Sequence, residues 1–202
     1  MTQAPDTGRS AHGDHEQTNP WLTHTNEVVY DNPWINVSHR TVTTPTGTKG
    51  IYGVVSFKNL AMAVVPIDDE DHTWLVGQYR YATNHYTWEV PEGGGPLDES
   101  PGDAARRELR EECGLEAADL ELLMTAELSN SVTDERAHIY VATGLTPVPS
   151  DPDDTEVLRL RRLPVDEAIA MVMNGEITDA LSMLALYRLA IDRGWAASAR
   201  NP

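Results

Sequence analysis

Alternating and continuous apolar segments in the first third of the chain predict β-strands. Residues 27–31, 35–44 and 51–57 are rich in β-branched and aromatic side chains, and apolar and polar positions alternate in the second segment. Residues 45–50 have the Pro, Gly and Thr content of a turn. We therefore expect a small antiparallel sheet ahead of the main domain.

The rest of the chain contains further strand patterns. The continuous apolar run 60–67 is typical of a buried strand, and 73–80 is expected to be its hairpin partner across an acidic turn. Additional strands are predicted at 120–128, 137–145 and 156–163. The polar segment between the first two of these strands predicts a loop.

Helical signals occur in three places. Ser100 is a good N-cap, Pro101 suits the first helical position, and Gly114 supplies a left-handed stop, so a helix is predicted over 101–113. Two more helices are expected at 165–173 and 178–193, where apolar residues keep helical spacing.

Length and composition bound the domain organisation. The chain has 202 residues, of which 40% are hydrophobic, enough for a sizeable core. Residues 1–20 are polar, which predicts a disordered tail. We expect a β-sheet region at 21–58 and the main domain at 59–195.

Charge and cysteine content exclude several classes of protein. The net charge of −17 argues against non-specific nucleic acid binding, which requires many basic side chains. The single cysteine, Cys113, forms no disulfide within the chain, which fits a reducing compartment. Because there is neither a long apolar stretch nor a signal pattern, we expect a soluble, cytoplasmic protein that does not contact membranes.

Three carboxylates on the first predicted helix suggest a metal site. Glu108, Glu111 and Glu112 have i, i+3, i+4 spacing, which puts them on one helix face. Like charges repel there, and a hard cation such as Mg²⁺ or Mn²⁺ turns this repulsion into ligation. The alternative is a solvated charged face, which is the commoner role of such a triplet alone.

The surroundings of this triplet carry a family resemblance. The spacing G, five residues, E, seven residues, R-E-U-x-E-E-x-G-U, where U is aliphatic, resembles the Nudix box without a gap. It is formed by Gly93, Glu99, Arg107, Glu108, Leu109, Glu111, Glu112, Gly114 and Leu115. The resemblance implies a loop-helix-loop Mg²⁺ site that hydrolyses a nucleoside diphosphate linked to another group.

Residues before the box indicate one branch of this family. The triplet at 78–80, Gln-Tyr-Arg, and the segment 88–93, Trp-Glu-Val-Pro-Glu-Gly, look like the sugar-nucleotide branch of ADP-ribose pyrophosphatases and relatives. Glu92 stands where that branch usually has alanine, and its backbone carbonyl is expected to ligate a metal. Relatives specific for ADP-ribose tend to have a proline about fifteen residues after the box. This chain has no proline there, which is a departure from that group.

Other candidate residues lie outside the box. Arg80 ends an apolar strand, where its guanidinium would grip a phosphate. Trp34 would either stack on a nucleobase or fill the core or an interface. The resemblance implies a glutamate in the 129–136 loop that ligates a metal or acts as base. Glu135 is the best match and Asp134 the second, although both are also explained as exposed loop charges.

Within the box, Arg107 projects about 100° away from Glu108 around the helix, so we expect it to orient a neighbouring glutamate such as Glu99. A general base is expected among the glutamates, with Glu111 and Glu135 as candidates.

Together these features predict an α/β sandwich of the Nudix kind, with a mixed sheet between helices and an extra N-terminal antiparallel sheet. The resemblance implies Mg²⁺-dependent (or Mn²⁺-dependent) cleavage of a nucleoside diphosphate sugar to a nucleoside monophosphate and a sugar phosphate, in a homodimer. Alternatives are a nucleoside triphosphate pyrophosphatase or an isomerase of diphosphate lipids with the same fold. A sensor that binds without hydrolysis is a further alternative, against which the complete set of box glutamates argues.

Overall fold

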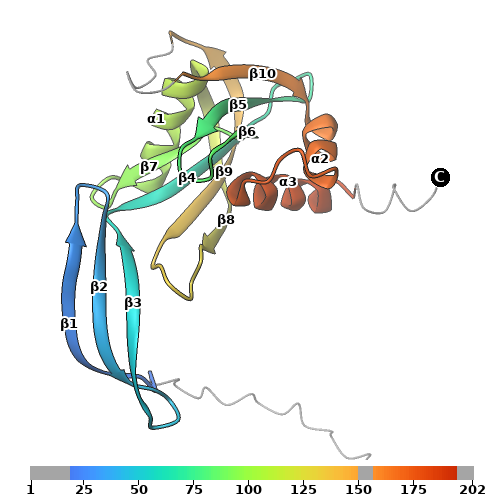
Figure 1. Ribbon diagram of the computed structural model, residues 1–202. Coiled ribbons are helices and arrows are strands. Elements are labelled where there is room, and N and C mark those ends of the chain that lie inside the picture. The colour runs from blue at the N-terminus through green and yellow to red at the C-terminus, as the bar shows by residue number, and fades with distance from the viewer. Residues whose placement is uncertain (1–18, 150–156, 195–202) are drawn as a thin grey trace, which may run out of the picture.

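The chain folds into a body of sheets covered by helices, from which a separate three-stranded sheet projects (Figure 1). The computed structural model describes residues 19–149 and 157–194. The tail predicted at 1–20 lies almost entirely outside the described residues, as does the end of the chain after 194.

The projecting sheet confirms the expected N-terminal strands. It is an antiparallel meander of β1 (Leu22–Asp31), β2 (Ile35–Thr43) and β3 (Lys49–Phe57). The β2–β3 turn contains Gly47 at φ 82°, a left-handed conformation that glycine adopts without strain. All ten residues of β1 are exposed, so this edge strand has no cover from the residues that the structure describes.

The body contains two further sheets. The larger has the order β7-β4-β9-β8, and its members are β4 (Asn59–Pro66), β7 (Glu92–Pro96), β8 (Leu115–Glu127) and β9 (Arg136–Pro147). The β4–β9 pair is parallel and the others are antiparallel, which makes the sheet mixed. The smaller sheet has the order β10-β5-β6, with β5 (His72–Arg80), β6 (His85–Glu89) and β10 (Arg159–Pro164).

The predicted hairpin between β4 and β5 is wrong. The Asp68 N–H does donate to the His72 carbonyl at 3.0 Å, so the turn forms. The two strands then enter different sheets, because both edges of β4 are paired with β7 and β9. A second difference is that the box glycines, expected in a loop, form the centre of strand β7.

The predicted helices are present with nearly the predicted bounds. In α1 (Pro101–Cys113), Ser100 Oγ accepts from the Asp103 N–H at 3.1 Å, and Gly114 ends the helix at φ 62°. The C-terminal helices are α2 (Val165–Met173) and α3 (Ala180–Asp192). None of the helices among the described residues is long and apolar enough to cross a membrane.

Alternate residues of β4 pack against different helices. Met62 and Val64 belong to a core cluster with α1, whereas Ala63 and Val65 belong to a cluster with α2 and α3. All four are fully buried, and each large apolar side chain in such a position contributes about 1.5–3 kcal/mol. Helices therefore cover both faces of a mixed sheet, which confirms the predicted sandwich.

Candidate functional site

Two glutamates of α1 press against the glycine strand. Glu108 and Glu112 are buried, and the Glu92 N–H donates to Glu112 Oε2 at 2.9 Å. Gly93 lies so close to Glu108 that a Cβ on this glycine would be 2.2 Å from its carboxylate. The glutamate face of α1 is thus turned towards the backbone of β7. Glu111 lies at the edge of this face, with its side chain about one-third exposed.

Arg107 holds several oxygens of the box at once. Its guanidinium donates to Glu99 at 3.3 Å, as expected, and to the Gly94 carbonyl at 3.0 Å. It also donates to Glu108 at 2.8 Å and Glu111 at 2.9 Å. The expectation that Arg107 projects away from Glu108 is therefore wrong, because the long side chain folds back across the helix face.

This arrangement fits a hard divalent cation. Glu108 and Glu112 supply buried carboxylates, and the backbone of Glu92 runs beside them. The narrow space at Gly93 would be filled by any larger side chain. Oxygen donors of this kind are those that Mg²⁺ and Mn²⁺ prefer.

A cavity of about 440 Å³ opens beside the glycine strand and brings the predicted substrate-binding residues together. Trp34, Arg80, Glu92, Gly93 and Glu135 all line it. The Trp34 side chain is 65% exposed, so core packing does not explain its position.

The N-terminal sheet fixes the loop that carries Glu135. The Val55 N–H donates to the Val132 carbonyl at 2.9 Å, and the Phe57 N–H donates to Asp134 Oδ1 at 2.9 Å. Burial raises the pKa of Glu135, and the neighbouring Asp134 raises it further. Glu135 therefore faces the cavity in a setting that favours proton uptake.

Arg80 is held by carboxylates on one side of this cavity. Its Nε and Nη2 atoms donate to Glu89 at 2.5–3.0 Å, and Nη2 also donates to Glu92 Oε1 at 2.5 Å. Glu89 is buried, whereas the Arg80 side chain is 38% exposed, so the pair lies at the boundary between the core and solvent. The guanidinium thus has a fixed position at the cavity wall.

Two acidic residues beside Arg80 and Glu92, namely Glu89 and Asp179, were not predicted from the sequence. Ligand oxygens of Glu89, Glu92 and Asp179 lie within 4.8 Å of one another, forming what we call the acidic group. Asp179 is 87 positions beyond Glu92, and its only local signal was that of an N-cap, which it also is for α3. Burial raises the pKa of Glu92 well above its usual value, and Asp179 and Glu89 raise it further against the opposing effect of Arg80.

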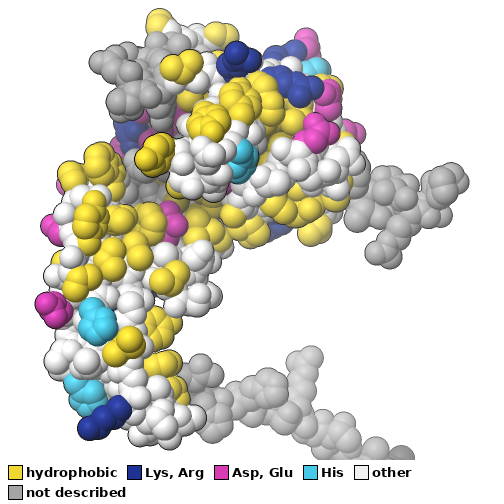
Figure 2. Space-filling view, viewed as in Figure 1, with side chains coloured by type: hydrophobic (Ala, Val, Ile, Leu, Met, Phe, Trp, Pro, Cys, Tyr) yellow, Lys and Arg dark blue, Asp and Glu magenta, His cyan; other side chains and the backbone are white. Residues whose placement is uncertain are grey.

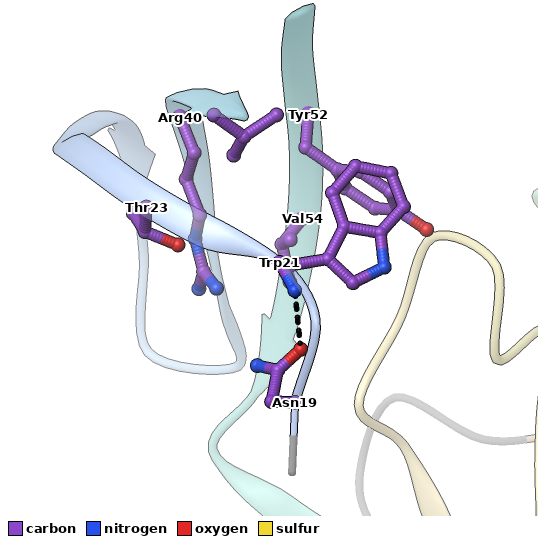
Figure 3. Close-up of a pocket in the computed structure, with 7 residues that line it drawn as sticks. Asn19, Trp21, Thr23, Arg40, Tyr52 and Val54 are labelled. Carbon is purple, nitrogen blue, oxygen red and sulfur yellow. Dashed lines mark hydrogen bonds between the residues drawn. The ribbon is translucent and has the colours of Figure 1, made fainter. Parts of the chain in front are cut away.

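A separate cavity of about 240 Å³ lies on the face of the N-terminal sheet (Figure 3). Trp21 and Tyr52 lie side by side there with ring centroids 5.4 Å apart, and Arg40 lines the same hollow. The Tyr52 hydroxyl donates to the Ser131 carbonyl at 2.6 Å. This cavity contains none of the box residues, and the Tyr52 hydroxyl connects the sheet to the loop before Glu135.

Comparisons with known proteins agree with this geometry. Residues 58–183 match the NUDIX domain, and residues 19–55 match the nucleoside diphosphate sugar hydrolase N-terminal domain.

Individual relatives carry related names. The chain is 33% identical to an ADP-ribose pyrophosphatase of Mycobacterium tuberculosis, over 67% of this chain and 68% of the relative. It is 29% identical to a CMP-5'-(N-acetyl-N-hydroxy-3-aminopropyl)phosphonate hydrolase of Streptomyces rubellomurinus, over 84% and 83% of the two chains. The crystal structure of an ADP compounds hydrolase superposes with a TM-score of 0.77 and 26% identity, covering 89% of this chain and 95% of the other.

Proposed function

Because this chain belongs to the Nudix hydrolase family, we propose that it hydrolyses the pyrophosphate bond of a nucleoside diphosphate sugar in a Mg²⁺- or Mn²⁺-dependent reaction. The products are a nucleoside monophosphate and a sugar phosphate. The observation that carries this proposal is the cavity in which Trp34, Arg80 and Glu135 converge on the box strand at Gly93. The names of the relatives, which act on ADP-ribose, ADP compounds and a CMP conjugate, support it.

The box residues are assigned to metal binding. Glu108, Glu112 and the Glu92 carbonyl are the principal proposed ligands, and Glu111 is a further ligand or base at the rim. When bound, the metal neutralises phosphate charge and makes water a better nucleophile. Arg107 bridges and orients the Glu108 and Glu111 carboxylates, and Glu99 accepts from the same guanidinium.

The cavity residues are assigned to the substrate. Arg80 donates hydrogen bonds to a phosphate, for which a guanidinium held at the wall is well suited. Trp34 presents an exposed indole for a nucleobase to stack on. Glu135 accepts a proton from the attacking water, and its raised pKa brings it nearer to neutral pH, where a general base works best.

The proposal includes a homodimer formed through the N-terminal sheet. Hydrophobic side chains gather on the part of that sheet nearest the body (Figure 2). Exposed fractions exceed one half at Val28, Val29, Tyr30 and Trp34, at the end of β1 and just after it. Leu22 and Ile51, which are also more than half exposed, lie towards the other end of the sheet. Apolar surface of this kind on an edge strand favours a second copy of the sheet. We also propose that 21–58 and 59–195 are the two folded units and that the enzyme works in the cytoplasm.

A substrate panel tests the reaction. Purified protein is assayed with ADP-ribose, ADP-glucose, GDP-mannose, UDP-glucose and a nucleoside triphosphate, each with Mg²⁺, with Mn²⁺ and with excess chelator. We expect metal-dependent hydrolysis of at least one nucleoside diphosphate sugar. Hydrolysis of the triphosphate alone would instead establish the alternative triphosphate pyrophosphatase, and binding without any turnover would establish a sensor.

A further inference from the structure

We propose that the N-terminal sheet positions the general base of the reaction, through two hydrogen bonds to the loop that carries Glu135. We call residues 129–135 the base loop. In one of these bonds the Tyr52 hydroxyl donates to the Ser131 carbonyl, and in the other Asp134 accepts from the backbone of β3. Tyr52 and Asp134 are positioning residues that act through Glu135, and this inference rests on the proposed function.

The base loop occupies one edge of the N-terminal sheet (Figure 1). β1 forms one edge of this sheet, and β3 forms the other. A parallel bridge joins β3 to the loop, with Val55 opposite Thr133. The Val55 N–H donates to the Val132 carbonyl at 2.9 Å, and the Val55 carbonyl accepts from the Asp134 N–H at 3.3 Å. The base loop therefore extends the sheet by a short segment beyond β3.

Side-chain hydrogen bonds fasten the base loop on either side of this bridge. The Tyr52 hydroxyl is directed at the loop (Figure 3) and lies 2.6 Å from the Ser131 oxygen. An edge-to-face contact with Trp21, at 5.4 Å between ring centroids, supports the Tyr52 ring. Further along β3, the Phe57 N–H donates to Asp134 Oδ1 at 2.9 Å. Because the proposed base directly follows Asp134, the second bond ends beside it.

The backbone of the base loop requires support from its surroundings. Ser129 has φ 45°, a left-handed conformation that is costly for a residue with a side chain and persists where other contacts hold it. Within the loop, the Ser129 carbonyl accepts from the Val132 and Thr133 N–H groups. The Thr133 hydroxyl donates to the Leu128 carbonyl. These internal bonds fix the shape of the loop, whereas the bonds from β3 fix where it lies.

The end of β3 also holds Trp34, on the nucleobase side of the cavity. The Lys58 N–H donates to the Trp34 carbonyl at 2.8 Å, and Lys58 directly follows Phe57, which holds Asp134. Trp34 and Glu135 line the same cavity. The sheet is thus a common frame for the nucleobase platform and the general base. Such a frame matters because a misplacement of about 1 Å can reduce a rate by roughly 10²-fold.

Removing the two side-chain bonds separately tests this inference. Tyr52→Phe removes the hydroxyl, and Asp134→Ala removes the acceptor. Each is expected to lower kcat by about 3- to 10-fold, the factor that one hydrogen bond accounts for. KM should stay nearly unchanged, because Arg80 and Trp34, which are assigned to the substrate, are not altered. Rates are measured at the high-pH plateau with the nucleoside diphosphate sugar that the wild type hydrolyses fastest.

Matched variants distinguish these hydrogen bonds from other changes. Asp134→Asn loses the charge but keeps an oxygen that can accept from Phe57, so its kcat at the plateau should stay near the wild-type value. Tyr79→Phe removes a hydroxyl that donates to Asn84 at 2.8 Å, outside the base loop, and is the control for Tyr52→Phe. Thermal unfolding identifies any loss of fold, and Tyr52→Phe alone decides if Asp134→Ala does not fold.

A double-mutant cycle with Glu135→Gln tests whether the two residues act through the base. In the Glu135→Gln background, Tyr52→Phe should cause no further loss, because no proton acceptor remains to be misplaced. A loss by the same factor in both backgrounds would show that Tyr52 acts elsewhere and would overturn the inference. Wild-type kcat in Tyr52→Phe and Asp134→Ala, or a loss confined to KM, would overturn it as well.

Failure of the proposed function gives a different result. A wild type that hydrolyses no member of the substrate panel counts against the hydrolysis itself. An active wild type whose rate is unaffected by Glu135→Gln leaves the hydrolysis in place and overturns the positioning role of Tyr52 and Asp134.

Discussion

The Glu92 N–H donates a hydrogen bond to Oε2 of Glu112 across twenty positions of sequence, at 2.9 Å. This bond joins strand β7 to helix α1 at the point where the proposed metal ligands meet. The helix carboxylate is therefore oriented by the strand whose carbonyl is assigned to the same metal. Such support of a ligand by hydrogen bonds is a general requirement of precise metal sites.

Replacing Glu112 by glutamine distinguishes the role of its negative charge in catalysis from the role of its hydrogen bond in stability. The glutamine carbonyl can still accept from the Glu92 N–H, whereas the negative charge is lost. We expect kcat to fall by about 10²-fold or more, with little change in melting temperature. Steady-state kinetics and thermal unfolding measure the two effects, with Glu116→Gln, a more exposed glutamate just beyond the helix, as control. An unchanged rate would remove Glu112 from the ligand set.

Gly93 and Gly94 offer a test of close packing between strand and helix. A Cβ at Gly93 would be 2.2 Å from the Glu108 carboxylate, whereas one at Gly94 would be 3.1 Å from the Asn59 amide nitrogen. Gly93→Ala is therefore expected to displace Glu108 and raise the metal concentration needed for half-maximal activity by at least about 10-fold. Gly94→Ala should have a much smaller effect. Metal titrations of both variants make the comparison, and equal effects would contradict it.

Local chemistry made much of this site predictable. The cap at Ser100 and the stop at Gly114 are set by neighbouring residues, so helix α1 was predicted with its bounds. The continuous burial of β4 from Met62 to Pro66 likewise agrees with the predicted strand enclosed on both faces.

The errors concern relations between distant segments. Two adjacent apolar strands joined by a turn look like a hairpin, yet β4 and β5 each find other partners, because pairing depends on which edges the rest of the chain covers. Asp179 directly precedes a predicted helix, and this position identifies it as an N-cap but does not show that its carboxylate also lines a cavity. Its approach to Glu92 follows only from the packing of α3 against the body.

If the exposed apolar side chains of β1 form the dimer interface, a negative charge introduced among them should weaken the dimer. Val28 is 57% exposed on this edge strand, and burying an unpaired carboxylate in an interface is costly. We expect the wild type to be a dimer and Val28→Asp to shift it to monomer at micromolar concentration, as measured by analytical ultracentrifugation. Thr46→Asp adds the same charge in the exposed β2–β3 turn, at the other end of the sheet from Val28, and serves as control. A monomeric wild type would refute the proposed interface.

Asp134 and Glu135 predict a shift in the pH dependence of the reaction. Burial raises the pKa of Glu135 above its ordinary value of about 4.3, and the charge of Asp134 adds to the effect. As the proposed base, Glu135 must be deprotonated, so the acidic limb of kcat/KM should have its midpoint above that ordinary value.

Asp134→Asn removes the neighbouring charge while its amide oxygen can still accept from the Phe57 N–H. The midpoint should therefore move to lower pH, with the plateau at high pH little changed.

The linked effect on folding has a fixed sign. A carboxyl whose folded pKa is raised contributes stability below its unfolded pKa, and that contribution is lost as pH rises through the folded pKa.

Asp134→Asn lowers the folded pKa of Glu135, so the loss of this contribution should be complete at a lower pH and be smaller in total. Melting temperatures measured from pH 4 to pH 8 report the stability effect, and initial rates over the same range report catalysis. If the acidic limb stays in place in Asp134→Asn, a group other than Glu135 accepts the proton. If Glu135→Gln also retains full activity, the loop has no catalytic role and Glu111 becomes the remaining candidate base.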